Sequence, residues 1–295
     1  MFDKKAYQRE YMRGKRRSIW DVFRKAPAPD IEKMEHEKDI PGLIYALTIN
    51  DYFTIIKSID ALARIKDTRA IEPLLSISKS PDLHLYVRDA LISIGEPSVN
   101  DLIVALSDKE DFTRIAACQA LEKIQDKRAS TALLKALNDE DFSVSYHAVI
   151  ALGMLKEEDA ILPIINRLKN NMTMPYMSVE YTALRNIGDK AIIELINVLD
   201  EGQLTGKTYN LIENVRTFLI AIGEPAVLPL IQALPSNNPW MRLRIAEILG
   251  FIGDIRAVEP LQNQLAYESM HWKEFPLGHI VYYTVEDAIK KCRKR

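Results

Sequence analysis

The pattern that decides the fold is Ala90-Leu91-Ile92-Ser93-Ile94, a small residue followed by leucine, two further residues and isoleucine. The same order of a small or apolar residue, leucine, and isoleucine or leucine occurs in six other places, at intervals of 29 to 35 residues. A regular period of this length is typical of solenoid proteins, in which each repeat stacks on the next. The seven copies begin at Ala61, Ala90, Ala120, Ala151, Ala183, Phe218 and Ile248.

Each copy continues through a short polar break into a second apolar helical pattern. Some breaks begin with aspartate, as in Asp67-Thr68-Arg69-Ala70, and others read Gly95-Glu96-Pro97. Glycine can end a helix in a left-handed conformation, and aspartate or proline favours the start of the next one. We therefore predict that each repeat is an antiparallel pair, a first helix that carries the pattern and a second helix after the break. The small residues that open most of the patterns are expected where helices approach closely.

Both ends of the chain depart from this repeat pattern. Residues 40–47 read as a second helix without a clear first partner, and a last helix is expected at about residues 280–291. The longest interval contains surplus residues at 201–207. We predict an N-terminal arm over residues 1–30, a solenoid over 31–266, and an aromatic loop with a C-terminal capping helix over 267–295.

The composition is that of an ordinary soluble protein. The chain has 295 residues, a net charge of −2 and 47% hydrophobic residues, which excludes a wholly disordered chain. No apolar run approaches the roughly 18 residues that a membrane-spanning helix needs. Cys118 and Cys292 cannot form a disulfide framework, so we expect a reducing compartment and a cytoplasmic location. A charge near zero argues against non-specific binding of nucleic acid by the chain as a whole.

The repeats resemble HEAT repeats, in particular the short variety first noted in phycocyanobilin lyases. The resemblance covers roughly residues 40–266. It implies an all-α, right-handed armadillo-like superhelix of about seven hairpins, whose second helices line a concave surface. It does not select one function, because such repeats occur in lyase subunits, hydroxylases, DNA glycosylases and scaffolds. The residues that resemble the family most are Val87-Arg88-Asp89-Ala90-Leu91 through Ile94-Gly95-Glu96-Pro97, and Arg244-Ile245-Ala246-Glu247-Ile248-Leu249-Gly250 through Asp254-Ile255-Arg256-Ala257-Val258-Glu259-Pro260-Leu261.

The sequence lacks the clusters of catalytic or metal-binding residues that an enzyme active site needs. Deoxyhypusine hydroxylase, a HEAT-repeat enzyme, builds a di-iron site from several His-Glu pairs, whereas this chain has one such pair, His36-Glu37, before the repeats. One pair cannot hold two irons. The histidines lack zinc-site spacing, and Cys118 lies in an apolar pattern typical of a buried structural thiol. We predict no catalytic residue, no cofactor and no metal, and therefore a protein that is not an enzyme.

The predicted second helices also disfavour nucleic acid on the concave face. Their charges are mixed rather than a continuous cationic track, which phosphate binding requires. The acidic members are Glu72, Asp101, Glu194 and Glu259, and the basic members are Lys79, Lys135, Arg167 and Lys169.

The N-terminal arm combines basic and aromatic residues. Residues 1–25 contain nine basic and three acidic side chains, which leaves the rest of the chain with 30 basic and 38 acidic side chains, a net charge of −8. Such a segment can form an amphipathic helix that docks on a partner protein, a membrane surface or RNA. The alternative is that its apolar residues simply cover the open end of the solenoid. The candidate partner-binding residues of the arm are Arg13, Arg16, Arg17, Trp20 and Phe23.

A second candidate contact is the aromatic segment 267–276. Aromatic residues beside methionine and lysine are typical of interface anchors, which here are Tyr267, Trp272 and Phe275. The alternative is a C-terminal cap that folds its rings onto the last repeat.

Taken together, these features predict a non-catalytic scaffold, adaptor or regulatory subunit that binds a partner protein on the concave face. Stacked repeats provide a long, preformed surface that loses little entropy on binding. One alternative is a lyase- or chaperone-type accessory protein that delivers a prosthetic group to a client. Another is recruitment to RNA or a membrane surface through the basic arm.

Overall fold

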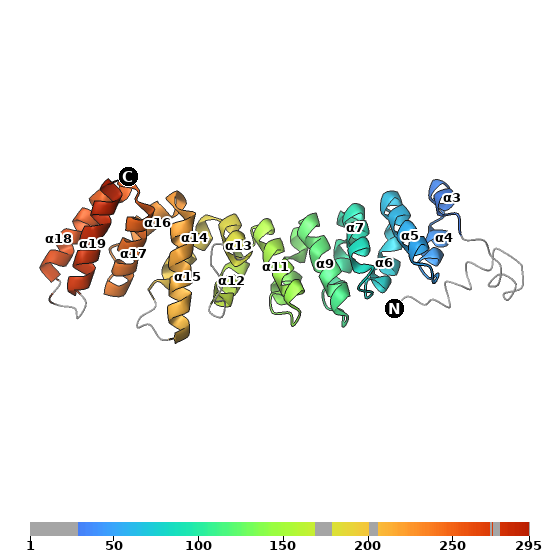
Figure 1. Cartoon of the computed structure of the whole chain (residues 1–295), viewed down its shortest axis with the longest axis horizontal. Helices are drawn as coiled ribbons and strands as arrows, with labels where there is room; N and C mark the ends of the chain where they lie inside the picture. Colours follow the sequence, from blue (N-terminus) through green and yellow to red (C-terminus); the bar gives the residue numbers. More distant parts are fainter. Residues whose placement is uncertain (1–28, 169–178, 201–205, 272, 274–277, 295) are drawn as a thin grey trace, which may run out of the picture. The chain divides into compact units, whose positions relative to one another are not determined.

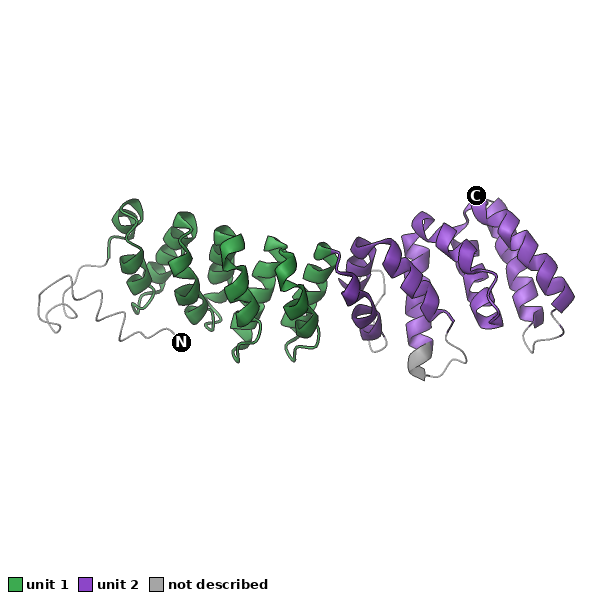
Figure 2. Cartoon of the chain, turned by 180° about the vertical axis from the view of Figure 1, so that it is seen from behind, with its two compact units in different colours: residues 1–155 green, residues 156–295 purple. Residues whose placement is uncertain are grey.

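The computed structural model describes residues 29–168, 179–200, 206–271, 273 and 278–294, and all regular structure within these ranges is helical (Figure 1). The predicted all-α fold of stacked hairpins is confirmed. Two compact units make up the chain, unit 1 with residues 1–155 and unit 2 with residues 156–295 (Figure 2). The handedness of the predicted superhelix stays a prediction.

Unit 1 alternates long first helices with short second helices. First helix α5 packs on α7, α7 on α9, and α9 on α11, so that successive repeats lie side by side. The helix predicted at residues 40–47 is α4, and it has a first partner that the sequence analysis missed, the short α3, which packs on both α4 and α5. The helices of unit 1 are α3 (Ile31–His36), α4 (Ile40–Ala46), α5 (Tyr52–Ile65), α6 (Ile71–Ile77), α7 (His84–Ile94), α8 (Val99–Ala105), α9 (Asp111–Ile124), α10 (Ser130–Ala136) and α11 (Phe142–Leu155).

Unit 2 continues the alternation and ends with a single long helix. The predicted last helix is α19, which packs along both α17 and α18. Helix α18 extends to His271, so residues 267–271 are helical and not part of the loop expected at 267–276. Of the surplus residues 201–207, Gly206 and Lys207 already belong to α15. The helices of unit 2 are α12 (Ile161–Arg167), α13 (Val179–Ile187), α14 (Asp189–Val198), α15 (Gly206–Ile222), α16 (Glu224–Ala233), α17 (Pro239–Ile252), α18 (Val258–His271) and α19 (Gly278–Arg293).

The repeating residues form the core as predicted. The alanines that open five of the patterns are at most 1% exposed, and the leucines that follow them are at most 2% exposed. Burial of one such leucine stabilises the fold by roughly 1.5–3 kcal/mol. The rows are Ala61, Ala90, Ala120, Ala151 and Ala183, and Leu62, Leu91, Leu121, Leu152 and Leu184.

The tight turns inside the hairpins are of two kinds. In one kind, glycine takes a positive φ, as predicted for Gly95 and Gly223 and as also found at Gly188. In the other, an aspartate such as Asp126 accepts a hydrogen bond from the backbone N–H two residues later. The residue before that aspartate is left-handed even where it is not glycine, as at Gln125, where φ is 56°. These non-glycine positions could not be predicted from the sequence, because lysine and glutamine adopt this conformation only rarely.

First helices α9 and α11 share a buried polar cluster. The Glu122 side chain, 7% exposed, lies 2.7 Å from both His147 Nδ1 and Lys123 Nζ. Gln119 Nε2 lies 2.9 Å from the other ring nitrogen of His147. Burial raises the pKa of Glu122, but the hydrogen bonds from His147 and Lys123 outweigh burial and hold the pKa below its usual value. His147 thus packs between α9 and α11.

This cluster gives the stability a pH dependence. The pKa of Glu122 is lower in the folded chain, so its ionised form stabilises the fold above the ordinary value of 4.5, and this contribution is lost as pH falls through the lowered value. We expect Glu122→Gln to reduce the free energy of unfolding by about 1–3 kcal/mol at pH 7. In urea titrations at several pH values, the difference from the parent should shrink as the pH is lowered below 4.5. Glu140→Gln, at a side chain 89% exposed, is the control and should have little effect at any pH.

Helices α17 and α19 meet at a glycine. A Cβ atom added to Gly250 would lie 2.9 Å from the Cα atom of Ala288, which is backbone and cannot move aside without shifting α19. We expect Gly250→Val to reduce the free energy of unfolding by about 1–3 kcal/mol through overpacking. The control is Ala266→Val, at an exposed position of α18. The thermal unfolding midpoints of both variants are measured. Equal midpoints for the two variants would contradict this packing.

Candidate functional site

The second helices of unit 2 present a row of exposed aliphatic side chains. Leu162, Ile193 and Leu228 are 55%, 50% and 54% exposed, and they occupy the same register position in α12, α14 and α16. These helices are neighbours, since α14 packs against both α12 and α16. We call these three residues the aliphatic row. The matching residues in α6, α8 and α10 of unit 1 are exposed and polar, namely Glu72, Asn100 and Thr131, whereas α4 has Pro41 there. In unit 2, α18 has the exposed Glu259 at this position.

A row of carboxamides lies one helical turn further along the same face. Residues four apart in a helix lie on one face, and the residues four positions after the aliphatic row are Asn166, Asn197 and Gln232, all exposed. Helix α18 adds the exposed Asn263 at the same register position. We call these four residues the amide row. The matching residues of unit 1 are Ser76, Val104 and Lys135.

Two hollows lie along this face. The first, about 440 Å³ between α12 and α14, is lined by Leu162 and Ile193 and by the ion pair of Glu158 with Lys190. The second, about 420 Å³ between α16 and α18, is lined by residues that include Asn263 and Tyr267. The aliphatic row therefore borders one hollow and the amide row ends in the other.

Tyr267 forms one wall of the second hollow. Its ring stacks on the ring of His271, with a centroid distance of 4.2 Å, and the guanidinium of Arg242 lies 5.4 Å from the centroid of the tyrosine ring. The Tyr267 residue is 42% exposed. Among the predicted partner-binding residues it is the one that the structure describes, and it lies beside this face.

The floor beneath Tyr267 is a buried ion pair. Arg242 is 1% exposed and Glu268 is 0% exposed, and their Nε and Oε1 atoms are 2.5 Å apart. Gln264 donates to the same carboxylate at 2.8 Å, and the guanidinium also donates to the backbone carbonyls of Ser236 and Asn237 at 2.9 and 3.2 Å. Arg242 thus joins the loop before α17 to α18, the helix that carries Tyr267.

The described part of unit 1 contains one similar arrangement of a buried arginine, a carboxylate and backbone carbonyls. Arg114 is the fourth residue of α9, as Arg242 is of α17. Its guanidinium pairs with Asp139 at 2.9 and 3.0 Å and donates to the backbone carbonyls of Asp108 and Lys109. The arrangement is therefore a structural element of the repeat rather than a catalytic one.

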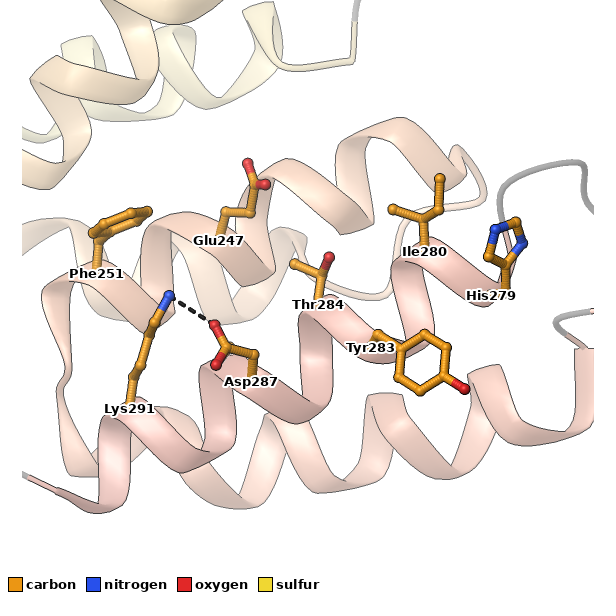
Figure 3. A pocket seen from close by; sticks show the side chains of 10 residues that line it. Glu247, Phe251, His279, Ile280, Tyr283, Thr284, Asp287 and Lys291 are labelled. Atoms are coloured by element: carbon orange, nitrogen blue, oxygen red, sulfur yellow. Dashed lines mark ion pairs between the residues drawn. The ribbon is translucent and has the colours of Figure 1, made fainter.

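A third hollow lies on the first-helix side of unit 2. Figure 3 shows this pocket, about 460 Å³ between α17 and α19, with Phe251 and Lys291 at one end and Ile280 and His279 at the other. Lys291 pairs with Asp287 at 2.7 Å and lies 4.7 Å from the centroid of the Phe251 ring. The charge of Lys291 is thus already paired within the chain. Burial raises the pKa of Glu247, which also lines the pocket.

The remaining predicted residues lie elsewhere. Arg13, Arg16, Arg17, Trp20, Phe23, Trp272 and Phe275 are outside the described residues, so their role stays a prediction. The aliphatic row and the amide row of unit 2 were not predicted from the sequence. Their signal is the contrast between matching second-helix positions in the two units.

Other predicted features can be located. Cys118 is fully buried, its thiol lies 3.4 Å from the carbonyl of Val144, and burial raises the pKa of that thiol. His36 is the last residue of α3. Within the described ranges, no group of three or more His, Cys, Asp or Glu side chains is placed to hold a metal ion. No helix of the described part is both long and apolar enough to span a bilayer.

Two family models match parts of the chain. A model of HEAT repeats matches residues 97–171, and a model of the PBS lyase HEAT-like repeat matches residues 241–267. The bilin biosynthesis protein PecE of Nostoc sp. (strain PCC 7120) is 27% identical over 199 residues, which cover 63% of this chain and 77% of PecE. The predicted HEAT-like repeats of the phycocyanobilin lyase type are confirmed.

Two solved structures are similar at low TM-scores. The complex of CpcE and CpcF of phycocyanin lyase from Nostoc sp. PCC7120 gives a TM-score of 0.39 at 20% identity, covering 86% of this chain and 94% of that chain. Human deoxyhypusine hydroxylase in complex with glycerol gives 0.37 at 19% identity, covering 90% of this chain and 100% of that chain.

The buried ion pair predicts a large effect of one substitution. We expect Glu268→Ala to reduce the free energy of unfolding by about 3–5 kcal/mol, because it leaves the Arg242 charge buried without its carboxylate. The control is Glu35→Ala, which breaks the pair of Glu35 with Arg64, whose side chain is 61% exposed, and should cost less than about 1 kcal/mol. Urea unfolding measures both, and similar losses would contradict the structural role assigned to Arg242 and Glu268.

Proposed function

We propose that the chain is a non-catalytic accessory or adaptor protein that binds a partner protein through the second-helix face of unit 2. The observation that supports this most directly is the aliphatic row, in which three neighbouring helices expose a leucine or isoleucine at one register position. Leu162 and Ile193 line the same hollow, and apolar side chains gathered on a surface are typical of interaction sites. A cytoplasmic location is part of the same proposal.

The contrast with unit 1 strengthens the assignment of the face. Packing between repeats fixes the buried positions in both units, but it does not constrain the outward positions of the second helices. Three second helices of unit 1, α6, α8 and α10, have the polar residues Glu72, Asn100 and Thr131 at these positions, as expected of surface that stays in water. The aliphatic row therefore has no explanation in folding, and a binding role accounts for it.

A second candidate is an accessory role in attaching a prosthetic group to a client protein. The similarity to PecE, whose name places it in bilin biosynthesis, favours this candidate. In this version the partner on the second-helix face is the client. Co-expression with candidate tetrapyrroles distinguishes the two versions, since a coloured, bound species is expected only if the chain handles the group itself.

The proposal predicts where a partner can be crosslinked. With a photoreactive amino acid in place of Ile193 or Leu228, we expect one defined adduct in extract from the source cell. The same replacement at Asn100 or Thr131, which occupy matching positions in unit 1, should give none. Adducts from the unit 1 positions alone would contradict the assignment.

The aliphatic row also predicts a loss of affinity. We expect the triple variant Leu162→Ser, Ile193→Ser, Leu228→Ser to bind the crosslinked partner at least about tenfold more weakly, because it removes three apolar contacts. Its circular dichroism spectrum and thermal midpoint should match the parent, since all three side chains are exposed. Undiminished binding by a folded triple variant would refute the role of the row.

A further inference from the structure

We infer that the hollow between α17 and α19 binds an arginine side chain of a partner protein (Figure 3). The hollow shares no residue with the aliphatic row or the amide row, so this inference does not depend on the proposed function. Three features of the hollow support it, namely small residues where the two helices meet, aromatic side chains along it, and a carboxylate without a partner among the described residues.

The space in the hollow follows from the close contact of the two helices. Gly250 and Ala288 both line the hollow, and a Cβ atom on Gly250 would lie 2.9 Å from the Cα atom of Ala288. Because neither residue has a side chain beyond Cβ, about 460 Å³ remains open between larger side chains of α17 and α19. These include the rings of Phe251 and Tyr283, and the Tyr283 residue is 64% exposed.

Glu247 is the unpaired carboxylate of the hollow. It is half-buried, and it makes no hydrogen bond and no ion pair with any residue that the structure describes. Burial raises the pKa of its carboxyl group, so the ionised form is less stable here than in water. A cation that donates hydrogen bonds stabilises such a carboxylate. The hollow therefore has a place for the positive charge of a ligand.

The cations of the chain near Glu247 do not take this place. Two of them are engaged in ion pairs, and the third, Arg244, does not line the hollow. Together they lower the pKa of Glu247 by less than burial raises it. The ion pairs, each at 2.7 Å, are Lys291 with Asp287, and Arg216 with Glu213 on α15.

An arginine side chain fits this arrangement. Its planar guanidinium donates two parallel hydrogen bonds to one carboxylate, here Glu247, and is attracted to the face of an aromatic ring. The exposed ring of Tyr283 has no cation over it among the described residues and is available for that contact. Thr284, which also lines the hollow, offers a hydroxyl oxygen to a further N–H, and the exposed Ile280 can contact the aliphatic part of the side chain.

The same chemistry favours arginine over lysine. The ammonium group of lysine is a compact, strongly hydrated point charge that lacks the planar fork of the guanidinium. It cannot form the two parallel bonds to Glu247, and it loses more hydration when it enters a half-buried site. We therefore expect the hollow to discriminate between the two side chains.

Methyl NMR of the full-length chain tests the inference. The probe is Nα-acetyl-arginine methylamide, which presents the arginine side chain between neutral ends. We expect it to shift the methyl resonances of Ile280, assigned with an Ile280→Val variant. The citrulline analogue, which has an uncharged urea in place of the guanidinium, should leave them unchanged. No shift with the arginine compound, equal shifts with citrulline, or tighter binding of the lysine analogue would overturn the inference.

A matched pair of variants locates the binding at Glu247. We expect Glu247→Gln to bind the arginine compound at least about tenfold more weakly, because glutamine cannot form the charge-assisted pair. The control is Asp60→Asn, which removes the same charge from the chain. Asp60 is exposed and directly precedes the repeat pattern in α5, as Glu247 does in α17. The control should bind as the parent does, and equal losses in the two variants would contradict the site.

The stability of Glu247→Gln distinguishes a binding role from a structural one. The pKa of Glu247 is raised in the folded chain, so above the ordinary value of 4.5 its ionisation opposes folding. Removal of the charge should therefore keep or raise the thermal unfolding midpoint at pH 7. A lower midpoint would identify Glu247 as a structural carboxylate and overturn the inference.

Discussion

The structure depends on the burial of each helix pair against the next. A single hairpin has an apolar stripe that it cannot cover alone, and the alanine and leucine rows show that neighbouring repeats cover it. This constraint fixes the inward positions of every repeat and leaves the outward positions of the second helices unconstrained. Those outward positions are therefore open to residues that serve binding.

The sequence predicts the inward side of the fold well and the outward side poorly. Leu91 and its counterparts recur at a regular interval, so the hairpins, the turns at Gly95 and Gly223 and the last helix could all be predicted. Helix α3 was missed because it is six residues long and lacks the repeat pattern. The aliphatic row was not predicted because the sequence does not show which side of α12 faces water. Leu162 therefore resembles a core residue in the sequence, and only the structure shows that it is exposed.

Polar residues in this molecule divide into those that hold repeats together and those that are available to a ligand. Arg114 and Arg242 are nearly buried and have carboxylate and carbonyl partners, which identifies them as structural. Exposed carboxamides such as Asn166 and Gln232 do not serve packing.

We propose that unit 2, through its second helices, is the part of the chain that binds a partner. Hydrogen–deuterium exchange of the full chain, alone and with the crosslinked partner, tests this proposal. The account predicts that exchange slows in α12, α14, α16 and α18 and stays unchanged in α6, α8 and α10. Slower exchange confined to unit 1, or to the first helices of unit 2, would contradict it.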